Sequence, residues 1–448
     1  MTSGGGYAVC LNVEKVYRNG LCIGCGTCAS ICPRSAVKMI RDDSKGVYIP
    51  RVGMEDCNQC GSCLQVCPGH AVDFSDLSLR IFGNQPEDML MGNCANCYVG
   101  YASNYDIRYN SSSGGLVTAL LISALEDGLI DGALVTRVSK HKPLLPEAFV
   151  ARNQEEIISA CGSKYCPVPV NILLKKILRE KGRFAVVGLP CHIHGIRKFE
   201  RINKRLRERI LLHLGLFCAN GVTFLGTEYF LQGWKIKKES VNGLNYRGKG
   251  WPGRIVVQLK DEREKIIPRG TTEKSLFRRV LFYSAFHYDF THPRCLLCSD
   301  LTNVLSDISF GDPWLPDVLK EEKIGKSLVI SRSKIGDEIL RRALTKREVE
   351  MVEIRARKVL QAQNFGFKRD VGSRLRAVSS WGKPVPRYVP EPAESNRFKR
   401  ANMLFYLPSY FSARKYLWRV LYANAIIRQF SMNVLNAAGS RIATRTRR

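Results

Sequence analysis

The sequence CIGCGTCASICP at residues 22–33 returns as CNQCGSCLQVCP at residues 57–68, shifted by 35 positions. Both copies have the spacing Cys-x2-Cys-x2-Cys-x3-Cys-Pro. Three closely spaced cysteines on one loop supply three corners of a cubane iron–sulfur cluster, and the fourth thiolate must come from elsewhere. Zinc sites prefer paired Cys-x2-Cys units with a longer gap, and disulfides need an oxidising compartment. A repeated run of four cysteines fits neither alternative, and it predicts two iron–sulfur clusters.

The same run is typical of bacterial ferredoxins with two clusters, in which the fourth cysteine of each run ligates the other cluster. Residues 1–78 are therefore expected to form a two-cluster 4Fe–4S ferredoxin-like domain. The ligand sets predicted by this crossing are Cys22, Cys25, Cys28 and Cys67 for one cluster, and Cys57, Cys60, Cys63 and Cys32 for the other.

The chain of 448 residues has room for two or three domains, and its net charge is +29. The N-terminus lacks the basic and apolar segments of a signal peptide, which predicts a cytoplasmic protein, with peripheral membrane contact as an alternative. The longest uncharged run, residues 210–227, contains polar residues and glycines. It predicts a buried strand and loop rather than a membrane span.

The positive charge is concentrated at the C-terminal end, where residues 341–448 hold 24 Lys and Arg against 6 Asp and Glu. We expect residues 346–448 to be a basic region that docks on a partner or on a membrane surface. Within it, residues 413–438 are expected either to form a basic amphipathic helix on such a surface or to pack on the domain with a solvated basic face. No nucleic-acid reader motif accompanies the basic residues, so a nucleic-acid partner is not expected.

After a connector at residues 79–110, alternating strands and helices predict a mixed α/β sheet over residues 111–345, with function at the strand ends. The fold class expected for the whole chain is therefore α/β (α+β), with the ferredoxin-like unit in front. Residues 242–272 are expected to form a β excursion. The principal strands are expected at 132–136, 184–191, 210–218 and 327–332, and the principal helices at 116–126, 171–180, 192–199 and 338–344.

A small polar loop at residues 111–115 precedes the helix predicted at 116–126. The unpaired N–H groups at such a helix start favour a phosphate. The same residues are more often only an N-cap, and the pattern alone does not separate the two interpretations.

Four further cysteines lie where an apolar strand gives way to a loop, or within a short loop: Cys191, Cys218, Cys295 and Cys298. Buried structural cysteines would lie within strands and would not need the Cys-x2-Cys spacing. Together the four make a plausible third cubane site. Cys94 and Cys97 have the same spacing, but no second pair lies nearby, so free thiols are favoured over a metal site.

Five blocks in the α/β region occur in an order that resembles the beta subunit family of hydrogenases and dehydrogenases that use the deazaflavin coenzyme F420. The resemblance covers about residues 79–345, and a ferredoxin unit ahead of it is a common fusion in that family. Where the deazaflavin enzymes have Asp-Gly-Gly at the helix start, this chain has Ser113-Gly114-Gly115. The blocks are Ser112-Ser113-Gly114-Gly115 with Thr118, Ser163-Lys164-Tyr165, Gly188-x-Pro190-Cys191, Phe217-Cys218, and Cys295-x2-Cys298 followed by Ser306 to Asp312.

The resemblance implies FAD bound in the α/β domain beside a third 4Fe–4S cluster. Cys166 is a fifth candidate ligand, and Cys10, Cys94, Cys97 and Cys161 stay unassigned. Lys164 would act beside the flavin as the catalytic residue, against the alternative of a surface salt-bridge lysine. The residues implied are Ser113, Gly114, Gly115 and Thr118 for the FAD phosphates, Ser163, Lys164 and Tyr165 near the flavin, and Cys191, Cys218, Cys295 and Cys298 for the cluster.

These assignments imply an FAD and iron–sulfur dependent oxidoreductase that exchanges electrons with a redox partner and with coenzyme F420 or another small molecule. Two alternatives stay open. The chain could be a non-catalytic electron-transfer subunit that docks on a partner enzyme or a membrane, or a ferredoxin-dependent reductase of an unsaturated metabolite. No Ser/His/Asp set or carboxylate pair in the sequence indicates a hydrolase.

Overall fold

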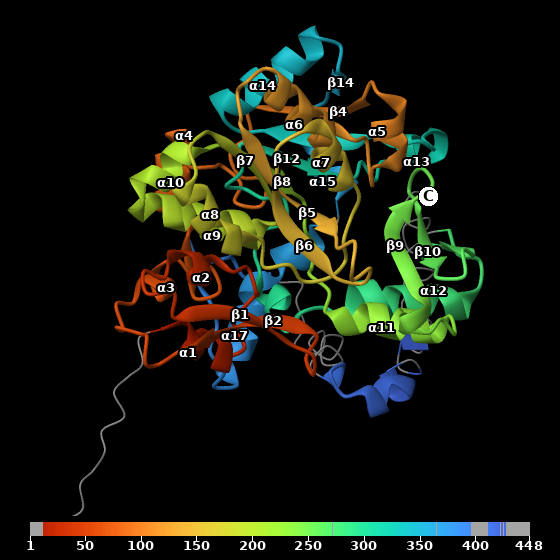
Figure 1. The fold of residues 1–448 in the computed structure, drawn as a ribbon, viewed down its shortest axis with the longest axis horizontal. Coiled ribbons are helices and arrows are strands. Elements are labelled where there is room, and N and C mark those ends of the chain that lie inside the picture. Colours follow the sequence, from red (N-terminus) through yellow and green to blue (C-terminus); the bar gives the residue numbers. More distant parts are fainter. Residues whose placement is uncertain are drawn as a thin grey trace, which may run out of the picture.

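The structure is a computed structural model that describes residues 12–270, 272–363, 365–395, 411–421, 423 and 425–426. Figure 1 shows the Cys-rich N-terminal unit below a large central sheet, and a smaller sheet beside it. Within the described ranges, no helix is both long and apolar enough to cross a membrane. Cys10 and most of the helix expected at residues 413–438 lie outside the described residues.

The N-terminal unit consists of α1 (Val13–Arg18), two short Cys-bearing helices and a β-hairpin. The helices are α2 (Thr27–Ile31) and α3 (Ser62–Gln65), and the hairpin pairs β1 (Val37–Asp42) with β2 (Val47–Val52). Each Cys-bearing helix starts after a glycine in the left-handed region, Gly26 at φ +87° and Gly61 at φ +73°, where other residues are strained.

The central sheet has eight strands in the order β14-β4-β13-β12-β8-β7-β5-β6. Its middle strands β12, β8, β7 and β5 run parallel, and the outer strands pair antiparallel. Buried residues fill the middle strands, as expected for parallel strands covered on both faces. The strands are β4 (Asn96–Ala102), β5 (Gly132–Val138), β6 (Pro146–Ala151), β7 (Phe184–Gly188), β8 (Ile210–Leu216), β12 (Ile308–Gly311), β13 (Ser327–Ser331) and β14 (Val349–Glu353).

Helices alternate with these strands and confirm the mixed α/β fold. The helix predicted at residues 116–126 forms as α6 (Leu116–Glu126). Cys191 lies in the first turn of a helix rather than in a loop, because Pro190 already begins that helix. The other helices of this part are α5 (Tyr105–Asn110), α7 (Gln154–Ser159), α8 (Leu174–Arg179), α9 (Pro190–Ile202), α10 (Lys204–Arg209), α13 (Pro316–Glu321) and α14 (Lys334–Thr345).

The segment expected as a connector, residues 79–110, is not one. It begins inside α4 (Phe74–Phe82) and contributes β4 and α5, and β4 lies between β13 and β14 in the sheet. Tyr98 of β4 is opposite Val329 on one side and Glu353 on the other. The strand therefore pairs with partners more than 200 residues later in the chain, although Tyr98, Val99 and Tyr101 are residue types common in strands.

The β excursion predicted at residues 242–272 is confirmed. β9 (Val241–Gly248), β10 (Arg254–Leu259) and β11 (Glu264–Pro268) form a three-stranded antiparallel sheet in the order β11-β10-β9. It shares a hydrophobic core with α11 (Phe224–Gly233) and α12 (Leu276–Tyr283). The strands β9 and β10 and the helices α11 and α12 lie to the right of the central sheet in Figure 1.

The first part of the basic region expected at residues 346–448 is built into the fold. β15 (Arg387–Val389) pairs in parallel with β3 (Ala71–Asp73) of the N-terminal unit. It follows α15 (Ala356–Ala362), α16 (Gly366–Arg369) and α17 (Val371–Ser380). Lys368 and Arg374 are almost completely buried, so at these two positions the region does not offer basic surface for docking.

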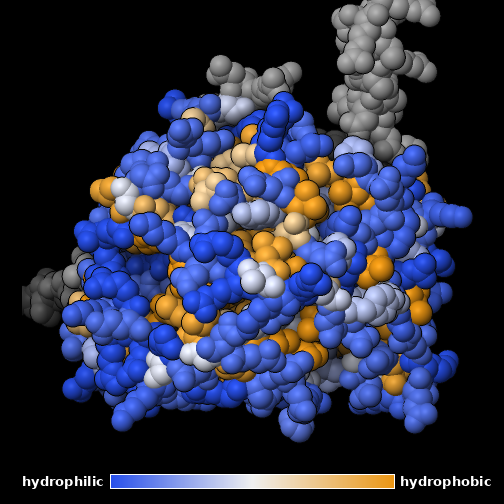
Figure 2. Space-filling model, turned by 90° about the horizontal axis from the view of Figure 1, so that it is seen from above, coloured by the Kyte–Doolittle hydropathy of each residue, from blue (hydrophilic) through white to orange (hydrophobic). Residues whose placement is uncertain are grey.

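The upper face of the molecule, seen in Figure 2, is mostly hydrophilic. Hydrophobic residues gather there in separate patches near its middle rather than in one continuous surface. Such scattered apolar residues are normal for a protein surface.

Candidate functional site

The thiols of the two Cys runs gather in two crossed groups. Burial raises the pKa of the Cys22, Cys28 and Cys67 thiols, and their mutual proximity raises it further. Cys22, Cys25, Cys28 and Cys67 together line one small cavity. The fourth cysteine of the second run thus lies with the first three of the first run, which is the arrangement that crossed ligation requires.

The second group lies nearer the surface. Burial raises the pKa of the Cys63 thiol, and the neighbouring Cys32 and Cys57 thiols raise it further. Cys60 is exposed, and contact with the Ser62 hydroxyl lowers the pKa of its thiol. A cluster held by these cysteines would be the one closest to an external electron carrier.

The third set of cysteines meets at the carboxyl edge of the parallel strands. Cys191 follows β7 and Cys218 follows β8, and these strands are neighbours in the sheet. Cys295 and Cys298 come from the 3₁₀ turn at residues 293–297. Burial raises the pKa of the Cys191 and Cys218 thiols, and the other thiols of the set raise it further. The structure therefore brings together the four cysteines predicted for a third cluster.

The three groups form a series through the molecule. The Cys28 thiol interacts with Cys63 of the surface group, and the Cys191 thiol interacts with Cys25. The group of Cys22, Cys25, Cys28 and Cys67 is therefore the middle one. Among the described residues, no cluster of three or more His, Cys, Asp or Glu side chains is arranged to hold a single metal ion.

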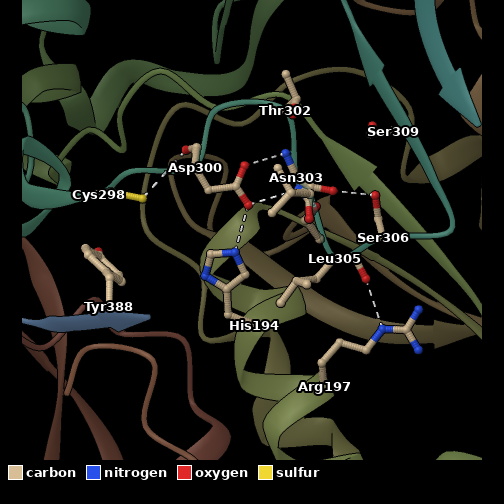
Figure 3. Close-up of polar contacts among 12 residues, drawn as sticks. His194, Arg197, Cys298, Asp300, Thr302, Asn303, Leu305, Ser306, Ser309 and Tyr388 are labelled. Carbon is tan, nitrogen blue, oxygen red and sulfur yellow. Dashed lines mark hydrogen bonds and ion pairs between the residues drawn. The ribbon is translucent and has the colours of Figure 1, made fainter. Parts of the chain in front are cut away.

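A buried polar loop shapes the third group (Figure 3). The Asp300 carboxylate accepts hydrogen bonds from His194 Nε2 at 2.8 Å and from the Asn303 and Val304 N–H groups at 2.8 and 3.0 Å. The Asn303 amide in turn donates to the Gly188 carbonyl at 2.9 Å, at the end of β7. These bonds fix the loop after Cys298 against the strand end that precedes Cys191.

Cations from the C-terminal region stabilise the same loop. Lys368 Nζ donates to the Cys298 carbonyl at 3.2 Å, and Arg374 Nε donates to the Leu296 carbonyl at 2.7 Å. The Tyr388 hydroxyl donates to the Leu297 carbonyl at 2.9 Å. Positive charge beside four cysteines suits a site that must hold thiolates. Sequence reasoning missed these contacts, because the residues lie at least 70 positions beyond Cys298.

A buried ion network ties α9 to the sheet. Arg197 donates to Glu200 at 3.1 Å, to Asp307 at 3.2 Å and to the Leu305 carbonyl at 3.0 Å. His213 contacts Asp307 through Nδ1 at 2.9 Å and Glu200 through Nε2 at 2.8 Å. Both ring nitrogens face carboxylates, which favours the imidazolium. Burial and the nearby Arg197 lower the pKa of His213, but the two carboxylates outweigh them and raise it.

The residues expected to hold the FAD phosphates gather at the start of α6, but two of their groups are already in use. Ser113 Oγ donates to the Lys326 carbonyl at 2.5 Å, and the Gly114 N–H donates to Ser327 Oγ at 2.8 Å. Gly115 has φ +78° and no side chain caps the helix that follows. The groups left for an anion are therefore the first backbone N–H groups of α6.

Lys164 is not a surface salt-bridge lysine. Its Nζ donates to the carbonyl oxygens of Ala160, Cys161 and Gly162 at 2.5, 3.1 and 2.9 Å. Burial lowers the pKa of Lys164 to about 8. Ser163 adjoins the loop before α6, because its N–H donates to Ser112 Oγ at 2.7 Å.

The neighbours of Lys164 are directed elsewhere. The Tyr165 ring packs 5.3 Å from the Tyr246 ring, in the core of the smaller sheet. Cys166 lies 3.8 Å from the Tyr246 hydroxyl, so the structure places this candidate ligand beside Tyr246. Thr118 Oγ1 lies 3.7 Å from the sulfur of Cys161.

The sequence missed one ion pair that joins the two sheets. Arg247 of β9 donates two hydrogen bonds to the Asp312 carboxylate, at 2.6 and 2.9 Å, and Trp251 Nε1 donates a third at 3.0 Å. Trp251 also stacks on Trp314, with 5.1 Å between ring centroids. Asp312 lay within a motif of the resemblance, but its partners come from the β excursion.

Comparison with known proteins matches most of the chain to two families. Residues 97–175 and 181–357 match the N-terminal and C-terminal parts of the coenzyme F420 hydrogenase/dehydrogenase beta subunit. Residues 21–71 match the 4Fe–4S dicluster domain.

Two curated relatives and one solved structure agree with this assignment. The coenzyme F420 hydrogenase subunit beta of Methanosarcina barkeri is 27% identical over 269 residues, 58% of this chain and 81% of that protein. The coenzyme F420-dependent sulfite reductase of Methanocaldococcus jannaschii is 25% identical over 81% of this chain and 52% of that protein. A chain of the F420-reducing NiFe hydrogenase complex from Methanosarcina barkeri has a similar fold, with a TM-score of 0.50 at 23% identity, covering 65% of this chain and 95% of that one.

Proposed function

Because this chain belongs to the family of coenzyme F420 hydrogenase and dehydrogenase beta subunits, we propose that it is a flavin-dependent iron–sulfur oxidoreductase. It holds three 4Fe–4S clusters and FAD, and it exchanges electrons with a deazaflavin or another small molecule. The observation that carries the proposal is the series of three cysteine groups, which runs from the exposed Cys60 to the strand ends of the α/β sheet.

FAD, when bound, supplies exchange between single electrons and electron pairs. The FAD phosphates would bind at the start of α6. No described side chain caps the helix after Gly115, so its first backbone N–H groups are available to an anion. Ser113 and Gly114 hold this helix start against β13. Lys164 is anchored by three carbonyl groups at the end of α7, and its lowered pKa allows it to give up a proton near neutral pH.

The choice of a deazaflavin as the small molecule rests on what the relatives are named for. Coenzyme F420 appears in the names of the hydrogenase subunit of Methanosarcina barkeri and the sulfite reductase of Methanocaldococcus jannaschii. Reduction of an unsaturated metabolite with electrons from a ferredoxin is the alternative for the same site.

A second candidate function is that of an electron-transfer subunit without a substrate of its own. A pocket of about 400 Å³ lies beside the surface group. Its lining includes Gly61, Lys198, Arg201 and Arg387, and among the described residues its single acidic lining residue is Asp73. Such a positively charged hollow suits docking of an acidic redox protein. In this case the substrate site lies on the partner protein rather than on this chain.

The first experiment is anaerobic reconstitution with iron, sulfide and FAD, followed by addition of reduced coenzyme F420. Bleaching of flavin and cluster absorption would support the enzyme with that substrate. Bleaching by dithionite but not by the deazaflavin would exclude this substrate. A ferredoxin would then be tried as the donor, which tests both the metabolite reductase and the electron-transfer subunit.

Paired charge reversals test the docking surface. Arg201→Glu and Arg387→Glu should slow electron exchange with an acidic ferredoxin about tenfold at low salt and less at high salt. The control is Arg342→Glu on α14, an exposed arginine away from this pocket. An equal effect of all three variants would show that only net charge matters.

A further inference from the structure

Cys94 and Cys97 form a thiol pair that the three cysteine groups and the flavin motif do not include. Their sulfur atoms lie 3.2 Å apart, and both residues are free thiols in this structure. A disulfide bond is about 2.05 Å long, so closure needs the sulfurs to approach by roughly 1 Å. No large rearrangement of the backbone is required.

The two thiols are held in different ways. Cys97 is the second residue of β4, lies opposite Ile330 of β13, and is 3% exposed. Its carbonyl accepts a hydrogen bond from the Ile354 N–H at 2.8 Å, which fixes the strand on its other side. Cys94 lies in the loop before β4 and is exposed. A reagent in solution therefore meets Cys94 first.

A buried guanidinium lies beside the pair. Arg332 is 4% exposed and donates to the Asn93 carbonyl at 2.6 Å, to Thr302 Oγ1 at 3.0 Å and to Ser309 Oγ at 3.2 Å. Thr302 and Ser309 lie on the loop and strand beyond Cys298 in Figure 3. These acceptors are neutral oxygens, and the charges that act on Arg332 are those of the Asp300 carboxylate and of the Cys94 and Cys97 thiols. A buried cation of this kind favours an anion nearby, and its charge acts on both thiols.

The local charges divide the roles of the two thiols. The hydrogen bond with Cys97 and the charge of Arg332 lower the pKa of Cys94 to about 7, although Asp337 of α14 opposes them. The same hydrogen bond and burial raise the pKa of Cys97, with Glu353 of β14 acting in the same direction. Near neutral pH Cys94 is therefore ionised in a substantial share of the molecules, while Cys97 stays protonated. The thiolate is the nucleophile in thiol–disulfide exchange.

We propose that Cys94 and Cys97 form a thiol–disulfide exchange site for small disulfide compounds. The Cys94 thiolate attacks one sulfur of the disulfide, forms a mixed disulfide with it, and releases the other half as a thiolate. The released thiolate takes the proton of Cys97. The Cys97 sulfur then attacks the Cys94 sulfur of the mixed disulfide, forms the Cys94–Cys97 disulfide, and releases the second half of the compound as a thiolate. Two electrons pass from the cysteine pair to the small disulfide compound, which becomes two monothiols. A small dithiol reduces the Cys94–Cys97 disulfide again by the reverse of both steps.

The test treats the reduced, reconstituted protein with the aromatic disulfide dithiobis(nitrobenzoate). Acid quenching, alkylation and tryptic digestion follow. Residues 81–108 form one tryptic peptide that contains only Cys94 and Cys97. We expect this peptide to lose two hydrogens and to carry no adduct. The peptide of residues 153–164 contains only Cys161 and serves as the single-thiol reference. An unmodified pair, or an adduct on each cysteine, would overturn the proposal.

Two variants assign the roles. Cys97→Ser should trap a stable mixed disulfide on Cys94, because the resolving thiol is gone. Cys94→Ser should slow reaction at Cys97 at least about tenfold, because Cys97 is buried and protonated. Unchanged reactivity of Cys97 in that variant would refute the division of roles. These readouts do not involve flavin turnover, so they stand or fall separately from the proposed oxidoreductase activity.

Discussion

Replacing Arg197 with leucine should destabilise the protein far more than the same change one turn later on α9. Arg197 contacts Glu200 and Asp307 at 3.1 and 3.2 Å, and its side chain is 10% exposed. Its loss leaves two buried carboxylates to share the single positive charge of His213. Removing one partner from such a buried pair costs about 3–5 kcal/mol.

The matched control is Arg201→Leu. Arg201 pairs with Asp76 at 3.1 Å, but its side chain is 38% exposed. An exposed pair of this kind contributes about 0–1 kcal/mol. The assay is urea unfolding of each reconstituted variant under anaerobic conditions, compared with the unaltered protein.

The cost of Arg197→Leu should also depend on pH. Burial raises the pKa of the Asp307 carboxyl, but Arg197 and His213 outweigh burial and hold it well below its usual range. Without Arg197 one carboxyl should bind a proton more readily in the folded state than in the unfolded state. The deficit should therefore shrink as the pH falls from about 8 to about 5.5. A cost no larger than that of Arg201→Leu, or one that is the same at both pH values, would refute this reasoning.

Substitutions at four further positions test other parts of the structure. Gly114→Ala places a methyl group 2.5 and 2.7 Å from backbone atoms of neighbouring strands, and should cost about 1–3 kcal/mol in thermal unfolding and lower FAD occupancy. Gly128→Ala meets open space at φ +63° and should cost only about 1 kcal/mol. Cys218→Ser should remove about a third of the bound iron in elemental analysis and leave the ferredoxin-type signals in electron paramagnetic resonance. Cys97→Ala should raise the pH midpoint of Cys94 alkylation above about 7, whereas Cys97→Ser keeps a donor and should leave it nearly unchanged.

The sequence alone was sufficient for several features that depend on neighbours in the chain. The repeated Cys run and the glycines before α2 and α3 encode a local loop, because three thiols and a left-handed turn lie within a few residues. The α6 helix was predicted with its observed ends, since its apolar residues and the following Gly128 mark it locally.

What the sequence missed involves partners far along the chain. β4 was taken for a connector because residues 96–102 gain strand structure only from β13 and β14. Lys368 and Arg374 looked like part of a basic docking region, yet they are buried as donors to the loop of the third cysteine group.

The functional site combines both kinds of information. The cysteine spacings predicted which cysteines would hold the two ferredoxin-type clusters, and the matched blocks indicated which cysteines would form the third group. Only the tertiary structure decided that Cys25 adjoins Cys191, that Ser113 is already bonded to Lys326, and that Arg332 lies beside Cys94. A spacing of two or three residues constrains geometry directly, whereas contacts across a hundred or more residues depend on how the whole chain packs.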